Sequence, residues 1–221
     1  CNLGSLNLSE FVAYPYTRNA YFDWNEFYNA IDIAVEALDT IIDENLDRHA
    51  LKEQSENSKN YRNIGLGVMG YANMLFKLGL TYGSKEAIQF TTELFRNMMH
   101  EALLVDIDLA IDKGAFPLCK PDKIAKSKLI NKILPPSDIE PIEEYGLRNC
   151  SLISIAPTGS IATMLGVSGG CEPEFALSYT RKTENLNGTY DVFCKSVEEY
   201  WKLTDEIIDK DSNEYKQNIF N

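Results

Sequence analysis

Apolar residues along this chain follow two alternating periods, one typical of strands and one typical of helices. Apolar positions recur through Cys1–Val12 before a turn-rich stretch, which predicts a first strand. Ile64–Val68 and Ser151–Ala156 are short apolar runs that predict two further strands, and Phe175–Tyr179 predicts another. Strands that alternate with long helices favour α/β architecture with parallel pairing.

The longest helices are predicted from apolar residues at helical spacing and from capping residues. The first begins after Asp23, with Glu26 as its capping-box partner, and fades near Asn45. Its expected buried stripe consists of Phe27, Ile31, Val35, Leu38 and Ile42. The second begins after Ser84 and stops at Gly114.

The remaining segments are shorter or less regular. Helices are predicted over residues 69–78 and 192–203. Residues 47–60 are polar, and residues 116–141 are rich in Pro and Lys. We therefore expect irregular connections in both places, the second with one short helix.

The composition narrows the classes of function. Of 221 residues, 44% are hydrophobic and 24% charged, with a net charge of −12, which is ordinary for a globular protein with a sizeable core. The negative charge argues against broad nucleic-acid binding, because that relies on Lys and Arg neutralising phosphates. No run approaches the roughly 20 apolar residues of a membrane helix, so we expect no membrane partner. The chain opens without Met, which indicates a processed product or an excised piece.

The cysteines point to a reducing compartment. The chain has five of them, Cys1, Cys119, Cys150, Cys171 and Cys194. They form no CxxC pair and no zinc-ligand spacing. An odd number at wide spacing is typical of the cytoplasm rather than of a secreted disulfide scaffold. We expect a cytoplasmic protein with no metal site, in which most thiols are simply buried.

Gly65–Gly70 matches GxGxxG, the fingerprint of dinucleotide-binding folds. Such a fold needs a full buried strand before the motif, but Ser55–Asn63 is polar. It also needs an acidic residue at the end of a second strand about 20 residues on, and the candidate Glu86 opens a helix instead. We therefore expect the glycines to serve close packing, and a nicotinamide dehydrogenase is a weak alternative.

Ile153–Ala162 combines an apolar strand, a turn and a helix start. Pro157 fixes the turn, and Gly159 frees the backbone. Thr158 and Ser160 supply hydroxyls where the helix begins. The orphan N–H groups and the dipole at such a start favour an anion such as phosphate. An ordinary Ser/Thr cap without a ligand fits equally well, and the Lys of a Walker loop is missing.

Two carboxylates, Glu172 and Glu174, follow a glycine bend after that helix. Near a phosphate loop, such a pair could do acid–base work. We expect instead that both are solvated charges at the start of the next strand.

Three separated segments resemble the large subunit of ribonucleotide reductases, and they occur in the family's order. Cys1–Leu8 resembles the strand that carries one of two redox-active cysteines. Ala156–Ala162, followed by Gly169–Leu177, resembles the substrate-phosphate loop and the strand after it. Arg62–Gly70 is similar to a helix-opening segment of the family. The loop sequence PTGS, with EPEFALSYTRK after it, is most like the adenosylcobalamin-dependent (class II) enzymes.

The resemblance implies a ten-stranded α/β barrel of two parallel halves, with residues 1–221 as one partial domain from the second half. In the family, a thiyl radical removes the ribose 3′ hydrogen with a Glu as base, and a dithiol pair reduces the 2′ carbon. By resemblance, Cys1 is one member of that dithiol pair. The residues that match the substrate-phosphate loop are Pro157, Thr158, Gly159, Ser160 and Ile161. The radical cysteine and the partner of Cys1 match no residue here, so this chain alone is expected to be inactive.

The resemblance also implies partners. These are a ribonucleotide substrate, the remainder of the reductase chain, a thioredoxin- or glutaredoxin-type reductant, and further subunits of an oligomer. The radical generator would be adenosylcobalamin in class II or a di-metal radical subunit in class I. The alternatives are a non-catalytic nucleotide- or phosphate-binding module and a glycyl-radical barrel, although Asn218–Asn221 shows no glycyl loop.

Overall fold

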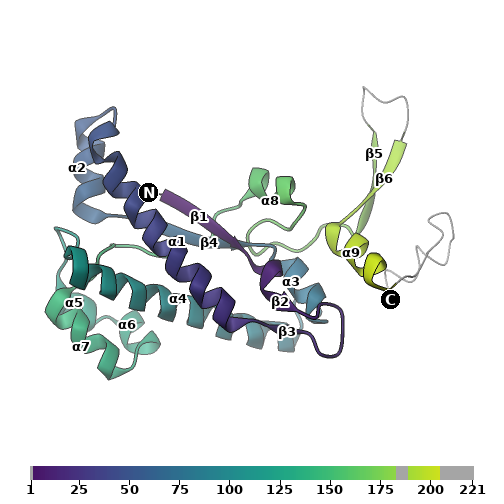
Figure 1. Cartoon of the computed structure of the whole chain (residues 1–221), viewed down its shortest axis with the longest axis horizontal. Coiled ribbons are helices and arrows are strands. Elements are labelled where there is room, and N and C mark those ends of the chain that lie inside the picture. Colours follow the sequence, from purple (N-terminus) through teal and green to yellow (C-terminus); the bar gives the residue numbers. More distant parts are fainter. Residues whose placement is uncertain (1, 183–188, 205–221) are drawn as a thin grey trace.

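The computed structural model describes residues 2–182 and 189–204. Long helices lie along a small parallel sheet, and a cluster of short helices packs at one end of α4 (Figure 1). The strands are β1 (Asn2–Asn7), β2 (Val12–Ala13), β3 (Tyr21–Phe22), β4 (Ile64–Met69), β5 (Ser178–Lys182) and β6 (Thr189–Phe193). The helices are α1 (Trp24–Asn45), α2 (Lys52–Tyr61), α3 (Tyr71–Lys77), α4 (Lys85–Lys113), α5 (Pro121–Ala125), α6 (Lys128–Ile133), α7 (Pro136–Tyr145), α8 (Gly159–Leu165) and α9 (Lys195–Thr204).

The central sheet is parallel, as predicted from the order of elements. β1 pairs with β4 in a register that sets Gly4 opposite Leu66. Ile153 forms a parallel bridge to Leu66, so residues 151–154 lie along the other edge of β4 as a third extended segment. The backbone N–H of Ser154 donates to the carbonyl of Leu66 at 3.0 Å. The carboxyl ends of all three segments therefore meet at one edge, where parallel sheets usually bind ligands.

The core lies between this sheet and the helices α1 and α4. The side chains of Asp23 and Ser84 cap α1 and α4, as predicted. The predicted stripe of α1, from Phe27 to Ile42, is buried. None of the helices in the described part of the chain is long and apolar enough to cross a membrane.

The predictions for the two connections are wrong. Residues 47–60 contain most of α2, and residues 116–141 contain α5, α6 and much of α7. Pro121 and Pro136 stand in the first turn of α5 and α7. Proline is tolerated there because its missing N–H would have no helical acceptor. These prolines therefore mark helix starts and not a continuous loop.

The strands also differ from their predicted limits. The first strand ends at Asn7, because the Asn7 side chain caps a 3-10 turn (Leu8–Phe11) by accepting from the N–H of Ser9. Residues 151–156 make a single bridge rather than a full strand. The strand expected at Phe175 begins at Ser178 as β5 and pairs antiparallel with β6.

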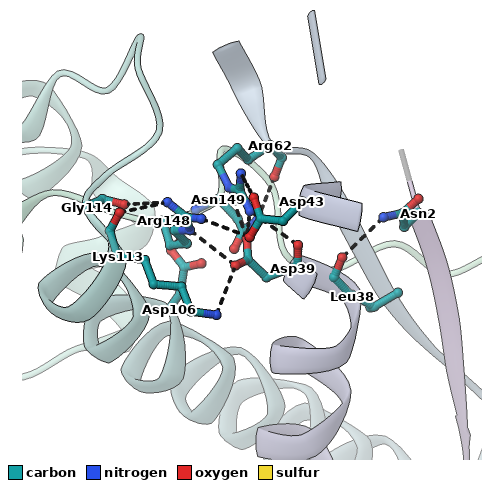
Figure 2. A network of polar contacts seen from close by, with 10 residues as sticks. All are labelled: Asn2, Leu38, Asp39, Asp43, Arg62, Asp106, Lys113, Gly114, Arg148 and Asn149. Atoms are coloured by element: carbon teal, nitrogen blue, oxygen red, sulfur yellow. Dashed lines mark hydrogen bonds and ion pairs between the residues drawn. The ribbon is translucent and has the colours of Figure 1, made fainter. Parts of the chain in front are cut away.

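A buried charge network holds the amino ends of the parallel segments against α1 (Figure 2). Arg62 stands two residues before the start of β4, and Arg148 lies shortly before the third segment. Arg62 Nη2 lies 2.6 Å from Asp39 Oδ1, and Arg148 Nε lies 3.2 Å from Asp39 Oδ2. Both arginines also reach Asp43, one turn along α1, at 2.7 and 3.2 Å. At β1, the side chain of Asn2 donates to the carbonyl of Leu38, again on α1, at 3.2 Å.

One further buried acid borders this network. Asp106 of α4 has no exposed surface, and its Oδ2 accepts from the backbone N–H of Asn149 at 3.3 Å. Burial raises the pKa of Asp106 well above its ordinary value, and the charge of Asp39 raises it further, against hydrogen bonds from the Asn149 and Arg148 backbone. Lys113 of α4 adds a third cation to the network, with its Nζ 3.8 Å from Asp39 Oδ2.

Candidate functional site

The loop Pro157–Ile161 lies at the carboxyl edge of the sheet, directly after the third extended segment. α8 begins at Gly159, as predicted, and its first helical hydrogen bond runs from Ala162 N to Thr158 O at 2.8 Å. The amide groups before Ala162 therefore have no acceptor within the helix. Ala162 packs with Met69 at the end of β4, so the helix start is fixed to the sheet while Gly159, Ser160 and Ile161 stay exposed.

Backbone strain in this loop falls on Thr158. Its φ is +54°, a left-handed conformation that β-branched residues rarely adopt. The Thr158 Oγ1 accepts a hydrogen bond from the N–H of Gly170 at 2.9 Å, which ties the loop to the glycine bend. A hydroxyl that accepts one bond can still donate its own hydrogen. Strained residues of this kind concentrate at functional sites.

The expectation that Gly159 frees the backbone is wrong, because its φ lies outside the left-handed range. A Cβ added at Gly159 would meet no atom of the described residues within 4 Å. The missing side chain instead leaves open space beside the exposed amide groups. This is the shape that a close-lying anion requires.

The glycines of GxGxxG serve packing, as expected. A Cβ at Gly67 would overlap the carbonyl oxygen of Ser154 in the third segment. Gly70 has a φ of +69°, and a Cβ there would overlap the side-chain oxygen of Asn7 at the end of β1. Both glycines thus allow the parallel segments to approach one another near the loop.

A second set of contacts, which the sequence did not reveal, fixes the segment that returns from α8. The carbonyl of Ser168 accepts from Gly70 N at 2.8 Å, and its hydroxyl accepts from Ala72 N at 3.1 Å. The backbone N–H of Ser168 donates to Asn73 Oδ1 at 2.8 Å. Ser168 therefore caps the first turn of α3 from a distant part of the chain, because Gly70 has no side chain to do so.

Comparison with protein families decides what kind of domain carries this loop. Residues 1–219 match the model of the family described as the ribonucleotide reductase barrel domain. The chain belongs to this family. The match covers the charge network, the parallel segments and the loop.

Individual relatives are reductases of greater length. The vitamin B12-dependent ribonucleoside-diphosphate reductase of Mycobacterium tuberculosis is 35% identical over 181 residues, which cover 82% of this chain and 23% of that protein. The protein of the same name from Thermoplasma acidophilum is 32% identical and covers 85% of this chain and 21% of its own length. The ribonucleoside-diphosphate reductase subunit alpha of Chlamydia pneumoniae is 28% identical over 87% of this chain and 20% of its own length. The chain spans about a fifth to a quarter of these relatives.

The two carboxylates of this reductase barrel domain lie in different environments. Glu172 is exposed, as expected. Glu174 is half-buried and accepts from Asn73 Nδ2 at 3.0 Å, so the expectation of a solvated charge is wrong for this residue. Burial raises the pKa of Glu174, although the Asn73 hydrogen bond lowers it in part.

The cysteines of the domain give less information about the site. Cys1, the predicted dithiol member, lies outside the described residues. Cys119, Cys150, Cys171 and Cys194 are free thiols. Burial raises the pKa of Cys194 to about 11, which disfavours the reactive thiolate. The described residues contain no group of three or more His, Cys, Asp and Glu side chains that could hold a metal ion.

Proposed function

We propose that this chain is the part of a ribonucleotide reductase catalytic subunit that holds the substrate phosphates. The observation that carries the proposal is an exposed helix start at the carboxyl edge of a parallel sheet, with strain at Thr158 and open space beside Gly159. Ligands of parallel α/β sheets bind outside the carboxyl ends of the strands. The relatives' printed names supply the substrate class, a ribonucleoside diphosphate.

The loop would hold the phosphates through several donors at once. The amide groups of Gly159, Ser160 and Ile161 have no helical acceptor, and the dipole of α8 adds partial positive charge. The hydroxyls of Thr158 and Ser160 would each donate one more hydrogen bond, worth roughly 1.5–3 kcal/mol to a charged group. Pro157 restricts the backbone conformation at the start of the turn. The ribose would thereby be oriented for the reaction.

The reaction would consume a dithiol. The 2′ hydroxyl leaves as water, the 2′ carbon gains hydrogen, and the two thiols become a disulfide. Cys1 is the proposed member of that pair in this chain. A thioredoxin- or glutaredoxin-type reductant would restore the dithiol.

The chain would form the second half of a ten-stranded barrel and act as one partial domain. Large apolar side chains are exposed around the sheet and α8, namely Leu3, Ile155, Ile161, Met164 and Phe175. Exposed apolar patches of this kind mark surfaces that other protein segments cover. The remainder of the reductase chain is the proposed cover, in a cytoplasmic enzyme that assembles as an oligomer.

The proposed radical generator is adenosylcobalamin, since two relatives are named vitamin B12-dependent. A di-metal radical subunit is the alternative, because another relative is named as a subunit alpha.

Gly159→Val in the complete protein tests the proposal. The added side chain meets no atom of the described residues, so the fold should survive, while the side chain fills the space proposed for the phosphate. We expect the Kd of a ribonucleoside diphosphate to rise by about a hundredfold, and by about tenfold in Ser160→Ala, which loses one charged hydrogen bond. Equilibrium dialysis measures both. Radical formation should not change.

The matched control is Ser127→Ala, which removes the hydroxyl cap of α6 and should leave the Kd unchanged. An unchanged Kd in Gly159→Val would show that the loop is an ordinary helix cap. Binding without reduction by the complete protein would favour a non-catalytic nucleotide-binding module instead.

A further inference from the structure

We infer that Asn73 is a positioning residue for the substrate loop, an inference that rests on the proposed phosphate site. The Asn73 side chain is 2% exposed and lies on α3, away from the loop itself. It makes three hydrogen bonds to three separate segments of the chain. One of these segments leads directly to the loop.

The first contact fixes Ser168. Asn73 Oδ1 accepts from the backbone N–H of Ser168 at 2.8 Å. The carbonyl and hydroxyl of Ser168 meanwhile cap the first turn of α3. Because backbone and side chain of one residue are held at three points, this residue has little freedom to shift.

Ser168 is connected to the loop through the next two residues, Gly169 and Gly170. Gly170 N donates to Thr158 Oγ1 at 2.9 Å. A Cβ at Gly169 would lie 2.6 Å from the carbonyl oxygen of Pro157, so the glycine bend and the loop are in close contact. A shift at Ser168 must therefore move Thr158 or break its bond to Gly170. The side-chain amide of Asn73 is thus linked to the proposed phosphate donors by three short steps.

The side-chain nitrogen of the same amide makes the other two hydrogen bonds. Asn73 Nδ2 donates to Glu174 Oε1 at 3.0 Å and to Ser196 Oγ at 2.8 Å. Ser196 belongs to α9 and is itself buried. The oxygen of the amide therefore binds the segment that contacts the loop, and its nitrogen binds Glu174 and α9. This division allows the two roles to be separated by mutation.

Asn73→Ala removes both the oxygen and the nitrogen of the amide and leaves the buried N–H of Ser168 without its acceptor. In the complete protein we expect the Kd of cytidine diphosphate, used as the probe, to rise by about tenfold, since displaced binding groups lose affinity steeply with distance. The rise should appear in KM more than in kcat, because ground-state and transition-state binding of the phosphates are lost together. Equilibrium dialysis and steady-state kinetics give the two readouts.

Ser196→Ala is the matched control. It breaks a hydrogen bond from Asn73 Nδ2 and leaves the bond from Ser168 N to Asn73 Oδ1 intact, so we expect the Kd to change less than about twofold. The rescue is the double variant Asn73→Asp with Glu174→Gln. The carboxylate still accepts from Ser168, and the new amide donates where Asn73 had donated. The Kd should return to within about twofold of the parent value by the same reasoning.

The outcomes separate this inference from the proposed function. An equal rise in Asn73→Ala and Ser196→Ala would overturn it, because the effect would then be a general loss of structure. No change in Asn73→Ala beside a raised Kd in Gly159→Val would also overturn it, while the phosphate site would stand. If Gly159→Val has no effect either, the phosphate site itself is wrong. Should Asn73→Ala not fold, the near-isosteric Asn73→Leu replaces it, because it also removes the acceptor of Ser168 N, and an unchanged Kd there would overturn the inference.

Discussion

The two ends of the parallel sheet are held by different chemistry. At the amino end, buried ion pairs fasten β4 and the third segment to α1 through Asp39, Arg62 and Arg148 (Figure 2). At the carboxyl end, neutral amide and hydroxyl groups of Asn73 and Ser168 fasten the returning segment to α3. At the first end, Asp39 is buried and faces Arg62, Arg148 and Lys113. The second end leaves an exposed loop with amide donors outside the helical ladder.

This difference indicates how the domain separates stability from binding. Two arginines that each contact two carboxylates form a rigid joint, because the guanidinium is planar and donates in fixed directions. Most of the donors of both guanidinium groups are used within this joint. In barrels of parallel strands, the carboxyl ends carry the chemistry and the amino ends contribute stability. In the present structure, the charge network lies at the amino end and the candidate loop lies at the carboxyl end.

Asp39→Ala should cause the largest loss of stability at the amino end of the sheet. It removes one carboxylate partner from each of two buried arginines. Removal of one member of a buried ion pair typically costs about 3–5 kcal/mol of stability. Asp43→Ala is the matched control, because the Asp43 side chain is 41% exposed. Solvent screens its pairs with the two arginines, so we expect a smaller loss of stability than in Asp39→Ala. Hydrogen exchange of β4 amides in the complete protein measures both. Equal effects would show that burial does not set the strength of the network.

Ser168→Ala should have a smaller and more local effect on stability. It removes the hydroxyl that caps α3 at the N–H of Ala72, and loss of a helix cap costs about 1 kcal/mol. Faster hydrogen exchange is expected at the start of α3 but not in α1. If α1 amides exchange faster to the same extent, the two ends of the sheet are not held independently.

The pH dependence of the two ends should have opposite signs. Burial alone would raise the pKa of Asp43, but the hydrogen bond and charge of Arg62, with the charge of Arg148, lower it below 3.8. Asp43 therefore stabilises the fold above that pH, and its contribution is lost as the pH falls through the lowered pKa. Burial raises the pKa of Glu174 above 4.5, so its carboxylate weakens the fold as the pH rises through the raised pKa.

Asp43→Asn should accordingly reduce protection from hydrogen exchange at pH 7, and Glu174→Gln should increase it slightly. Each change is expected to amount to a few tenths of a kcal/mol, since both groups are partly solvated. Both differences should vanish in acid. Exchange rates measured from about pH 2 to about pH 7 check the signs, because Asp43 is protonated only below its lowered pKa. Changes of the same sign would contradict the opposite environments of the two carboxylates.

Local sequence patterns predicted the elements that depend on residues close together in the chain. The cap at Asp23 and the apolar stripe behind it define α1, and the turn at Pro157 with the helix after it marks the loop. α2 was missed because it has no buried residue of its own. It ends at Arg62, which has a φ of +48° and is held by the charge network rather than by helical periodicity.

The contacts that hold the candidate site could not be predicted in this way. Asn73 and Ser168 are 95 residues apart, and Asp39 and Arg148 are 109 residues apart. Polar partners at such separations leave no periodic pattern in one sequence. These polar residues are distinguished by the burial of their side chains. That burial is known only once the sheet brings the segments together in the structure.

The cap that Ser168 provides to α3 also bears on how the chain folds as it is made. The cap lies 96 residues after the helix turn that it completes. At a synthesis rate of about 5–20 residues per second, α3 and the open edge of β4 would wait roughly 5–20 s for their partners to leave the ribosome. Contacts between distant residues form late, and an unpaired strand edge is open to wrong pairing meanwhile. The nascent chain is therefore most exposed to misfolding just before the loop emerges.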